Sequence, residues 1–292
     1  MKFLREFMLD HFQQFMIDRK WMKRKGYKVN WDSPRDINEK IQWLMCFSDT
    51  SRWSACSDKY KVREYVSSKG LGDILVPLLG VWSDASDIDF QSLPDKFAIK
   101  CNHDSGSCRI VDKQAGFDPD ELRAHLSSCL GRKYGYRYGE LYYNSIKPLI
   151  VAEKFLPADT KDYSSSTVDY KVWCFDGRPF SVLTCQNRKE DSVELNLYDL
   201  DWQVHPEVSV FSDHYRDGGG TIPRPKNLER MLEAASCLSE GFPEVRVDFY
   251  ESQEELYFGE MTFASMSGNM NYFTQEYLEE LGRQCILPPR VK

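Results

Sequence analysis

The chain has 292 residues, of which 41% are hydrophobic and 14% aromatic, so it can bury one large core or two to three smaller ones. Lysine and arginine total 38 against 45 acidic residues, which gives a net charge of −7. This balance disfavours a nucleic-acid-binding protein, because such proteins carry a concentrated basic face, and is typical of a soluble enzyme.

The nine cysteines are scattered along the chain, and neither a C-x-x-C pair nor a Cys/His cluster with zinc-finger spacing occurs. We interpret them as free, mostly buried thiols of a protein in the reducing cytosol.

The first 28 residues predict a helix. It is not a signal peptide, because the acidic residues Glu6 and Asp10 interrupt it. Its apolar stretch is also too short to span a membrane. Aromatic residues recur at near-helical spacing and basic residues follow them: Phe3, Phe7, Phe12 and Phe15, then Arg19, Lys20, Lys23, Arg24 and Lys25. This pattern fits an interfacial helix on anionic lipid at the inner face of the membrane. It also fits a helix whose aromatic face docks on its own domain, which is the interpretation we favour.

Further helices are predicted at 37–45 (INEKIQWLM) and 57–70, where apolar residues recur three and four apart. Residues 71–82 indicate a strand with turns, and 95–111 read as strand, polar glycine loop and strand. A helix over 118–130 follows, with Asp118 as its N-cap and Pro119 in its first turn.

Strand patterns dominate the rest of the chain, at 148–156, 168–186, 193–202, 245–251 and 255–263, and FDGRP is a hairpin turn. Helices are predicted at 227–242 and 274–284. Because strands and helices do not alternate regularly, the predicted class is α+β, or mixed α/β, rather than doubly wound.

The segment VRVDFYESQEELYFGEMTFASMSG carries the strongest chemical pattern. Arg246 and Asp248 lie two apart on a strand and share a face, as do Glu260 and Thr262 on the returning strand. A hairpin would place Asp248 beside Glu260, with Phe258 on the face of Glu260. Two carboxylates in apolar strands suit Mg²⁺, although a solvent-facing hairpin with outward charges explains the alternation equally well.

Two weaker patterns lie upstream. Lys100 ends the apolar strand FAIK, and a polar glycine loop that can approach phosphates follows it, although an ordinary β-turn is the simpler interpretation. His103 in this loop fits a hydrogen-bonding residue better than a catalyst. The strand IVAEKFLP (150–157) could line an adenine base or be a plain core strand.

In this order the patterns resemble the ATP-grasp superfamily and, more narrowly, the TupA-like ATP-grasp family of teichuronopeptide biosynthesis. The matching motifs run from about residue 25 to 290: INEKIQWLM, SDKYKVREYV, KCNHDSG, DYKVWCFDGRP, VRVDFYE, LYFGEMTFASMSG and YLEELGRQCILP. The resemblance implies an ATP-grasp fold in which two α+β subdomains clamp ATP. Its expected parts are a helical region at 1–94, an ATP-grasp subdomain at 95–157 and a second subdomain at 158–292.

The resemblance also implies roles for individual residues. Arg246, Lys100 and His103 would be catalytic, and Asp248, Glu260 and Thr262 would bind Mg²⁺. Thr262 departs from the asparagine that many ATP-grasp ligases carry there, which weakens a second metal site. The nucleotide would contact Lys100, Asn102, His103, Ser105, Gly106, Ser107, Glu153, Lys154, Leu156, Asp159, Lys171 and Arg188.

The implied reaction phosphorylates a carboxylate with ATP and captures the acylphosphate with an amine, and loop 102–107 would close to exclude water. The expected substrates are a small-molecule or glycan carboxylate and an amino acid, in polysaccharide assembly in the cytoplasm. A glycosyltransferase remains an alternative, with Asp-x-Asp spacing at 87–89 and 199–201, as does an ATP-binding scaffold without turnover.

Overall fold

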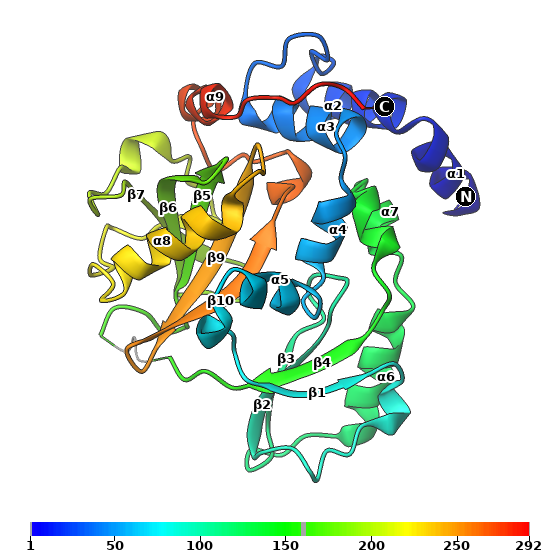
Figure 1. Ribbon diagram of the computed structural model, residues 1–292, viewed down its shortest axis with the longest axis vertical. Helices are drawn as coiled ribbons and strands as arrows, with labels where there is room; N and C mark the ends of the chain where they lie inside the picture. The colour runs from blue at the N-terminus through cyan, green and yellow to red at the C-terminus, as the bar shows by residue number, and fades with distance from the viewer. Residues whose placement is uncertain (1, 159–161, 292) are drawn as a thin grey trace. The chain divides into compact units, whose positions relative to one another are not determined.

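The computed structural model describes residues 2–158 and 162–291 (Figure 1). The chain divides into two compact units, one formed by Met1–Thr50 with Pro157–Lys292 and the other by Ser51–Leu156. Each unit contains its own sheet together with helices, so the predicted α+β class is confirmed. The three-part division inferred from the sequence stays a prediction.

The unit Ser51–Leu156 is built on a four-stranded antiparallel sheet in the order β1-β4-β2-β3. Its strands are β1 (Leu78–Trp82), β2 (Lys96–Cys101), β3 (Arg109–Asp112) and β4 (Ile150–Lys154). Its helices are α4 (Ser51–Ser57), α5 (Val62–Ser68), α6 (Pro119–Leu130) and α7 (Tyr134–Tyr138), with short 3-10 turns η1 (Gly72–Ile74), η2 (Ala85–Asp87) and η3 (Leu141–Ser145).

Helix α6 begins as its sequence predicts, because the Asp118 carboxylate accepts hydrogen bonds from the backbone N–H groups of Asp120 and Glu121. Its apolar side packs with strands β2 and β4 into one buried core that includes Leu126, Phe97 and Ile150. The core fixes the inner strands of this sheet, and β2 carries Lys100 while β4 carries Glu153.

The second unit is built on a six-stranded sheet in the order β10-β9-β5-β6-β7-β8. All neighbouring strands are antiparallel except the edge pair of β7 and β8. The strands are β5 (Asp169–Phe175), β6 (Arg178–Gln186), β7 (Val193–Tyr198), β8 (Tyr215–Asp217), β9 (Val245–Ser252) and β10 (Glu255–Thr262).

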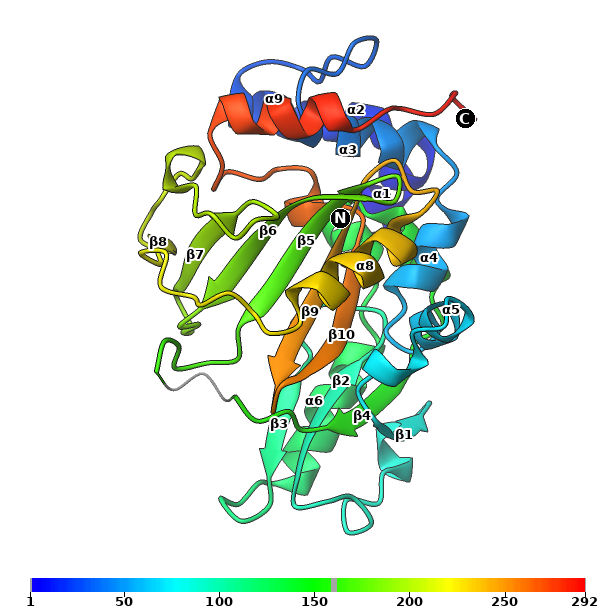
Figure 2. The same ribbon diagram turned by 60° about the vertical axis from the view of Figure 1, so that its left-hand side comes forward.

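Helices of this unit flank its sheet. They are α1 (Lys2–His11), α2 (Gln13–Lys25), α3 (Ile37–Phe47), α8 (Leu228–Ser239) and α9 (Gln275–Gln284), with 3-10 turns η4 (Pro206–Val208) and η5 (Ser265–Ser267). Helix α8 packs on β5, β6 and β9 through fully buried residues such as Met231 and Leu238 (Figure 2). It covers the apolar side of β9, where Val245, Val247 and Phe249 point, and leaves the polar side for chemistry.

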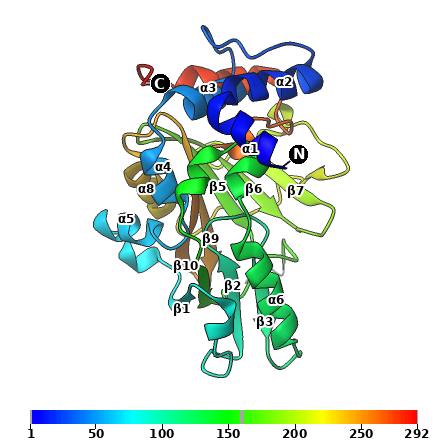
Figure 3. The same ribbon diagram turned by 90° about the vertical axis from the view of Figure 1, so that its right-hand side faces the viewer.

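The N-terminal helices correct the interpretation that we favoured for the four phenylalanines. The four residues lie on or between helices α1 and α2, which are adjacent in Figure 3. Their side chains do not dock on the unit but are exposed, and the buried side chains of these helices are Leu9, Ile17 and Trp21. Ile17 and Trp21 form a small core with Val29. Among the helices that the structure describes, none has the length and hydropathy to cross a membrane.

Strand β8 and helix α7 are among the elements that were not predicted. Strand β8 lies in a segment whose polar, glycine-rich sequence indicates a loop, and it pairs in parallel with β7 over three residues. Helix α7 is short, and its run of tyrosines and glycines carries no helical periodicity. All nine cysteines have free thiols, as predicted, although Cys108 is exposed.

Candidate functional site

The hairpin of β9 and β10 places two carboxylates opposite each other. Glu260 on β10 pairs directly with Asp248 on β9, and Thr262 pairs with Arg246. The turn lies at Gln253–Glu254, where both residues have positive φ. The predicted hairpin and the neighbouring position of its two acids are therefore confirmed.

One detail of the hairpin differs from the prediction. The pairing register shifts between Phe258 and Glu260, so that a β-bulge forms at Gly259. The strands approach so closely there that a Cβ on Gly259 would lie 2.9 Å from the Tyr250 ring and 3.0 Å from the Asp248 carbonyl oxygen. Phe258 consequently pairs with Phe249 on the apolar face, and its predicted position on the face of Glu260 is wrong.

Asp248 is held between two cations. The Nε and Nη2 atoms of Arg246 donate to its two carboxylate oxygens at 2.6 Å and 2.8 Å, and Lys171 Nζ on β5 donates to Oδ2 at 2.5 Å. The register of β5 against β9 makes this possible, because Lys171 lies directly opposite Asp248. Sequence reasoning proposed Lys171 as a ligand contact but missed its ion pair with Asp248.

Burial sets the electrostatics of this group, since Asp248 is only 1% exposed. Burial alone would raise the pKa of Asp248, but the charges and hydrogen bonds of Arg246 and Lys171 outweigh it and lower the pKa. For Lys171, burial is likewise the largest influence, yet Asp169 and Asp248 together raise its pKa. All three groups are therefore charged at neutral pH.

The remaining members of this cluster surround the guanidinium of Arg246. It donates to Thr262 Oγ1 at 3.1 Å and to Ser265 Oγ at 3.2 Å, and lies 3.6 Å from Glu260 Oε1. Glu260 itself is the open side of the cluster, with a side chain that is 42% exposed. We call Lys171, Arg246, Asp248, Glu260 and Thr262 the hairpin cluster.

The donor set of the hairpin cluster fits Mg²⁺. The ion takes one or two protein carboxylates and completes its octahedral shell with water and phosphate oxygens, and Asp248 and Glu260 supply two carboxylates from adjacent strands. Within residues 2–158 and 162–291, no group of three or more His, Cys, Asp or Glu side chains forms a metal cage. The cluster thus suits a cation that is shared with a phosphate ligand.

A strained turn follows β10 directly. Met266 and Ser267 both have positive φ, at 51° and 53°, and Gly268 follows at 63°. Helix α3 holds this turn, because Gln42 Nε2 donates to the Ser267 carbonyl at 2.6 Å, and a Cβ on Gly268 would lie 2.7 Å from the same nitrogen. The backbone beside Ser265 is therefore fixed next to Arg246.

Arg188 lies further along the same sheet. Its guanidinium donates to Asp169 Oδ2 at 2.6 Å, and Asp169 lies 3.9 Å from Lys171 Nζ. Asp169 was not among the predicted residues, and it connects Arg188 to the hairpin cluster. The charges thus alternate from Arg188, two residues after the end of β6, across β5 to β9.

In the unit Ser51–Leu156, Lys100 and Glu153 face each other across β2 and β4. Lys100 Nζ lies 2.6 Å from Glu153 Oε2, and Arg63 Nη1 lies 3.5 Å from Oε1. The sequence prediction had placed Glu153 at adenine and gave no role to Arg63 on α5, although Arg63 lies within the motif SDKYKVREYV. We call Lys100, Glu153 and Arg63 the strand cluster.

The loop after Lys100 is braced from within. Asn102 is fully buried, and its side-chain amide donates to Asp58 Oδ1 and the Lys147 carbonyl while its oxygen accepts from the Leu149 N–H. Ser107 donates to the buried Asp104, which also accepts from Arg132 at 3.1 Å. Only Ser105 and Gly106 of the predicted loop residues are exposed.

His103 is buried inside the same loop. Its Nε2 lies 3.3 Å from the Arg132 carbonyl oxygen, which makes Nε2 the protonated nitrogen, and its Nδ1 meets no hydrogen-bond partner among the described residues. Burial lowers the pKa of His103, so the ring is neutral at physiological pH. It therefore offers a lone pair rather than a positive charge.

The remaining predicted residues follow β4. Lys154 is exposed and Leu156 is half-buried at the end of the strand. Asp159 lies outside the residues that the structure describes. In the Asp-x-Asp pair at 199–201 of the alternative interpretation, Asp199 Oδ1 accepts from the backbone N–H groups of Asp201 and Gln203 and so forms a turn.

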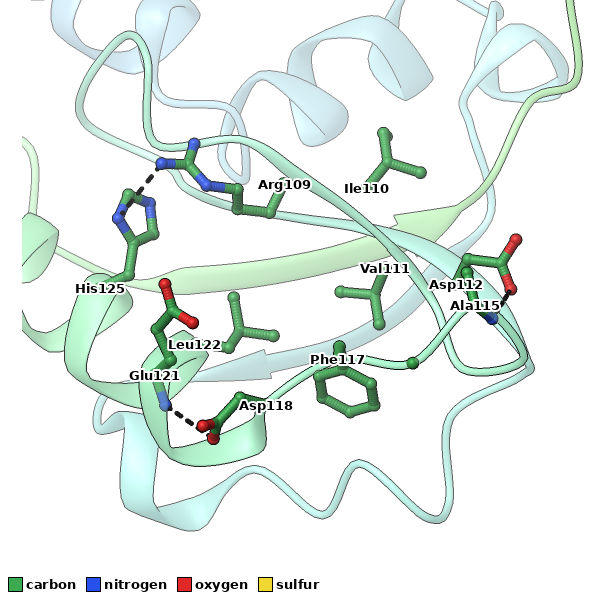
Figure 4. Close-up of a pocket in the computed structure, with 11 residues that line it drawn as sticks. Arg109, Ile110, Val111, Asp112, Ala115, Phe117, Asp118, Glu121, Leu122 and His125 are labelled. Carbon is green, nitrogen blue, oxygen red and sulfur yellow. Dashed lines mark hydrogen bonds between the residues drawn. The ribbon is translucent and has the colours of Figure 1, made fainter.

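A pocket of about 360 Å³ lies in the unit Ser51–Leu156, between β3 and the start of α6 (Figure 4). Phe117 and Leu122 form its apolar floor, while Arg109 and His125, 3.4 Å apart, mark one end. None of the predicted nucleotide-binding residues lines it. The pocket is therefore distinct from both the strand cluster and loop 102–107.

Comparison with known proteins gives the family. The family model described as TupA-like ATPgrasp matches residues 39–286, which is most of the chain and includes both clusters. The chain belongs to the TupA-like ATP-grasp family. The family predicted from the sequence motifs is thereby confirmed, whereas a search of curated proteins gives no match.

Two solved ligase structures are similar to this chain. D-alanine–D-alanine ligase from Bacillus anthracis, complexed with ATP, has 15% identity over 79% of this chain and 65% of its own, with a TM-score of 0.45. L-amino acid ligase from Bacillus licheniformis has 13% identity over 87% of this chain and 55% of its own, with a TM-score of 0.47. The chain thus spans less than two thirds of either ligase, and the likeness concerns the fold alone.

Proposed function

We propose that this chain is an ATP- and Mg²⁺-dependent carboxylate–amine ligase that forms an amide through an acylphosphate and releases ADP. The observation that carries the proposal is the hairpin cluster, in which a buried aspartate with a lowered pKa lies beside an open glutamate and is held by an arginine and a lysine. Family membership adds the expectation that ATP is the phosphoryl donor.

Mg²⁺, held by Asp248 and Glu260, would neutralise charge on the phosphates and polarise the transferred group. Thr262 Oγ1, which donates to Glu260 Oε1 at 3.3 Å, is the third proposed metal contact. Arg246 and Lys171 donate to both oxygens of Asp248. Coordination of Mg²⁺ by Asp248 would therefore require these two cations to turn toward phosphate oxygens.

Phosphoryl transfer needs alignment and charge stabilisation more than covalent help from the protein. We propose that Arg246 stabilises the negative charge that develops on the transferred phosphoryl and acyl groups, because α3 and the strained turn fix the backbone around it. Lys171 and Arg188 are proposed to contact phosphate or substrate. Their ion pairs with Asp248 and Asp169 hold them ready on one sheet face.

In the other unit, Lys100 is proposed to contact the α- and β-phosphates, and Glu153 and the Leu156 backbone to hold adenine, with Lys154 beside them. Within loop 102–107 the exposed backbone of Ser105 and Gly106 is best placed to approach phosphates. Asn102 and Ser107 shape the loop through their buried hydrogen bonds. His103 is proposed as a neutral hydrogen-bond acceptor, and Asp159 as a ribose contact by its position in the sequence.

We propose surface or capsular polysaccharide biosynthesis in the cytoplasm as the setting, with an amino acid joined to a uronic acid or a similar carboxylate. A screen of ADP release over pairs of uronic acids and amino acids tests this. ADP release that requires one carboxylate and one amine together is the expected result. ADP release that no pair stimulates above the ATP-only rate would contradict the ligase proposal.

Two alternatives are separated by a thermal-shift measurement. Stabilisation by ATP with Mg²⁺ but not by UDP-sugars is expected for the ligase, whereas the opposite pattern would favour a glycosyltransferase. An ATP-binding scaffold would be stabilised by ATP but would release no ADP with any substrate pair.

A further inference from the structure

The surface of α1 and α2 combines exposed aromatic side chains with basic ones. Phe3 is 83% exposed, Phe7 45%, Phe12 50% and Phe15 57%, and Leu4 and Met22 are also exposed. Single exposed apolar residues are common on proteins, but a contiguous group of large ones marks an interaction surface. We call these six side chains the aromatic face.

Helical geometry shows that the aromatic face is separate from the face that packs inward. In α1, Phe3, Leu4 and Phe7 lie within about 100° of one another around the helix, while the buried Leu9 lies on the opposite side. In α2, the buried Ile17 and Trp21 define the inner side. Each helix therefore presents a second apolar side, beyond the side that its own fold uses.

Basic residues share the outer side of α2 with the aromatic ones. One stripe along α2 consists of exposed residues at spacings of four, three and one: Phe15, Arg19, Met22 and Lys23. Lys25 lies next to this stripe, whereas Arg24 lies on another side of α2 and Lys28 follows the helix, and all three are exposed. Apolar side chains flanked by lysine and arginine on one helical side match the interface between acyl chains and anionic headgroups.

The charge distribution of the whole chain also favours an anionic lipid surface as the binding partner. Residues 1–28 hold eight lysines and arginines against three acids, whereas the chain as a whole carries −7. The positive charge is thus concentrated where the aromatic side chains are exposed. A protein partner is less compatible with this surface, because lysine is depleted in the cores of protein interfaces.

We propose that α1 and α2 form a peripheral docking surface for an anionic lipid bilayer, with the aromatic face inserted at the headgroup level and the basic residues on lipid phosphates. The binding is reversible and does not span the membrane. It is independent of the proposed ligase reaction, since no residue of the hairpin or strand cluster takes part.

Cosedimentation of the full chain with vesicles tests the proposal. Vesicles of phosphatidylglycerol and phosphatidylcholine should bind the chain at least about tenfold more tightly than vesicles of phosphatidylcholine alone, and 1 M salt should abolish the difference. Phe3→Ser with Phe15→Ser should reduce binding about tenfold or more, and Lys23→Glu with Lys25→Glu should do the same.

Matched controls use exposed residues elsewhere. Phe211→Ser with Ile286→Ser removes comparable apolar surface, and Lys61→Glu with Lys189→Glu makes the same charge change; both should leave vesicle binding within about twofold. Circular dichroism and ATP-induced thermal shift verify that each variant is folded. Equal binding by test and control variants would overturn the proposal. So would weak vesicle binding together with a dimer in light scattering that Phe3→Ser and Phe15→Ser dissociate, because the aromatic face would then be a protein interface.

Discussion

The strand cluster and the hairpin cluster each pair a lysine on one strand with a carboxylate on its neighbour, yet they differ in enclosure. Asp248 is almost completely buried and receives three donated hydrogen bonds from two cations. Glu153 keeps part of its side chain in solvent, and its second cation, Arg63, remains 3.5 Å away. The enclosed carboxylate is thus held by three close donors, whereas the more open carboxylate has one cation at 2.6 Å and a second at 3.5 Å.

The largest expected effect comes from breaking the enclosed pair. Asp248→Asn should lower ADP release by about a thousandfold, because it removes the carboxylate proposed to bind Mg²⁺ and the partner of both cations. Coupled-assay kinetics measure the loss, and circular dichroism verifies the fold. Asp213→Asn, at an exposed loop position, is the matched control and should keep full activity. Comparable rates for the two variants would remove Asp248 from the site.

Breaking the more open pair should cost less. Lys100→Met is expected to lower ADP release about a hundredfold with little change in unfolding temperature, since the Lys100 side chain is partly exposed and Arg63 still neutralises Glu153. The KM for ATP should rise as well, because Lys100 is proposed to contact its phosphates. If Lys100→Met kept its activity but lowered the unfolding temperature as much as Asp248→Asn does, both ion pairs would contribute to stability alone and Lys100 would have no role in the reaction.

Glu244 is a buried acid that differs from both Asp248 and Glu153. It directly precedes β9, and its carboxyl oxygens meet no hydrogen-bond partner among the described residues. Burial raises its pKa well above the usual range, and the nearby Arg246 opposes this only in part. At a pH below the pKa of Glu244 in the unfolded chain, near 4.5, the Glu244 carboxyl is protonated in both the folded and the unfolded chain. Above it the unfolded chain releases the proton while the native chain keeps it, so stability falls as pH rises toward the native pKa.

Glu244→Gln removes this pH-dependent cost. The free energy of unfolding of the variant, measured with denaturant, should match that of the parent near pH 4 and exceed it at pH 8. Glu233→Gln, at an exposed position of α8, should change stability by the same small amount at both pH values. A constant difference between Glu244→Gln and the parent across this range would contradict a buried protonated acid.

The smallest effect concerns the open side of the hairpin cluster. Thr262→Asn should lower the Mg²⁺ concentration for half-maximal ADP release by about threefold, because an amide carbonyl is a better ligand than a hydroxyl that already donates to Glu260. Thr262→Val should raise that concentration. A Mg²⁺ titration that is the same for the parent and both variants would exclude position 262 from the metal site.

Much of this architecture could be predicted from local sequence. Alternation on 245–251 and 255–263 gave the hairpin, the Asp118–Pro119 pair gave the start of α6, and the ordered motifs gave the family. These features depend on residues that are close in the chain, where propensity and periodicity apply.

Features set by pairing over long sequence distances could not be predicted. Lys171 meets Asp248 only because β5 and β9 align in one register. Arg63 reaches Glu153 from helix α5, and the charged residues of α5 give no sign of this contact in the sequence. The three residues of β8 form a strand because β7 offers a free edge, against their local preference. The exposure of the N-terminal phenylalanines depended on which of two apolar sides packs inward, and both sides look alike in the sequence.

The bulge at Gly259 has a consequence for how this hairpin can vary. Side chains on a strand alternate, so the bulge reverses the parity between the turn and the acids. Insertions or deletions of residue pairs near Gln253 would leave Glu260 opposite Asp248. Deletion of Gly259 would make Phe258 and Glu260 neighbours in sequence, and regular alternation would leave both side chains on the faces that they occupy now. The pairing of the two acids therefore does not depend on the extra residue, whereas the close approach of the strands at Tyr250 and Asp248 requires that this residue has no side chain.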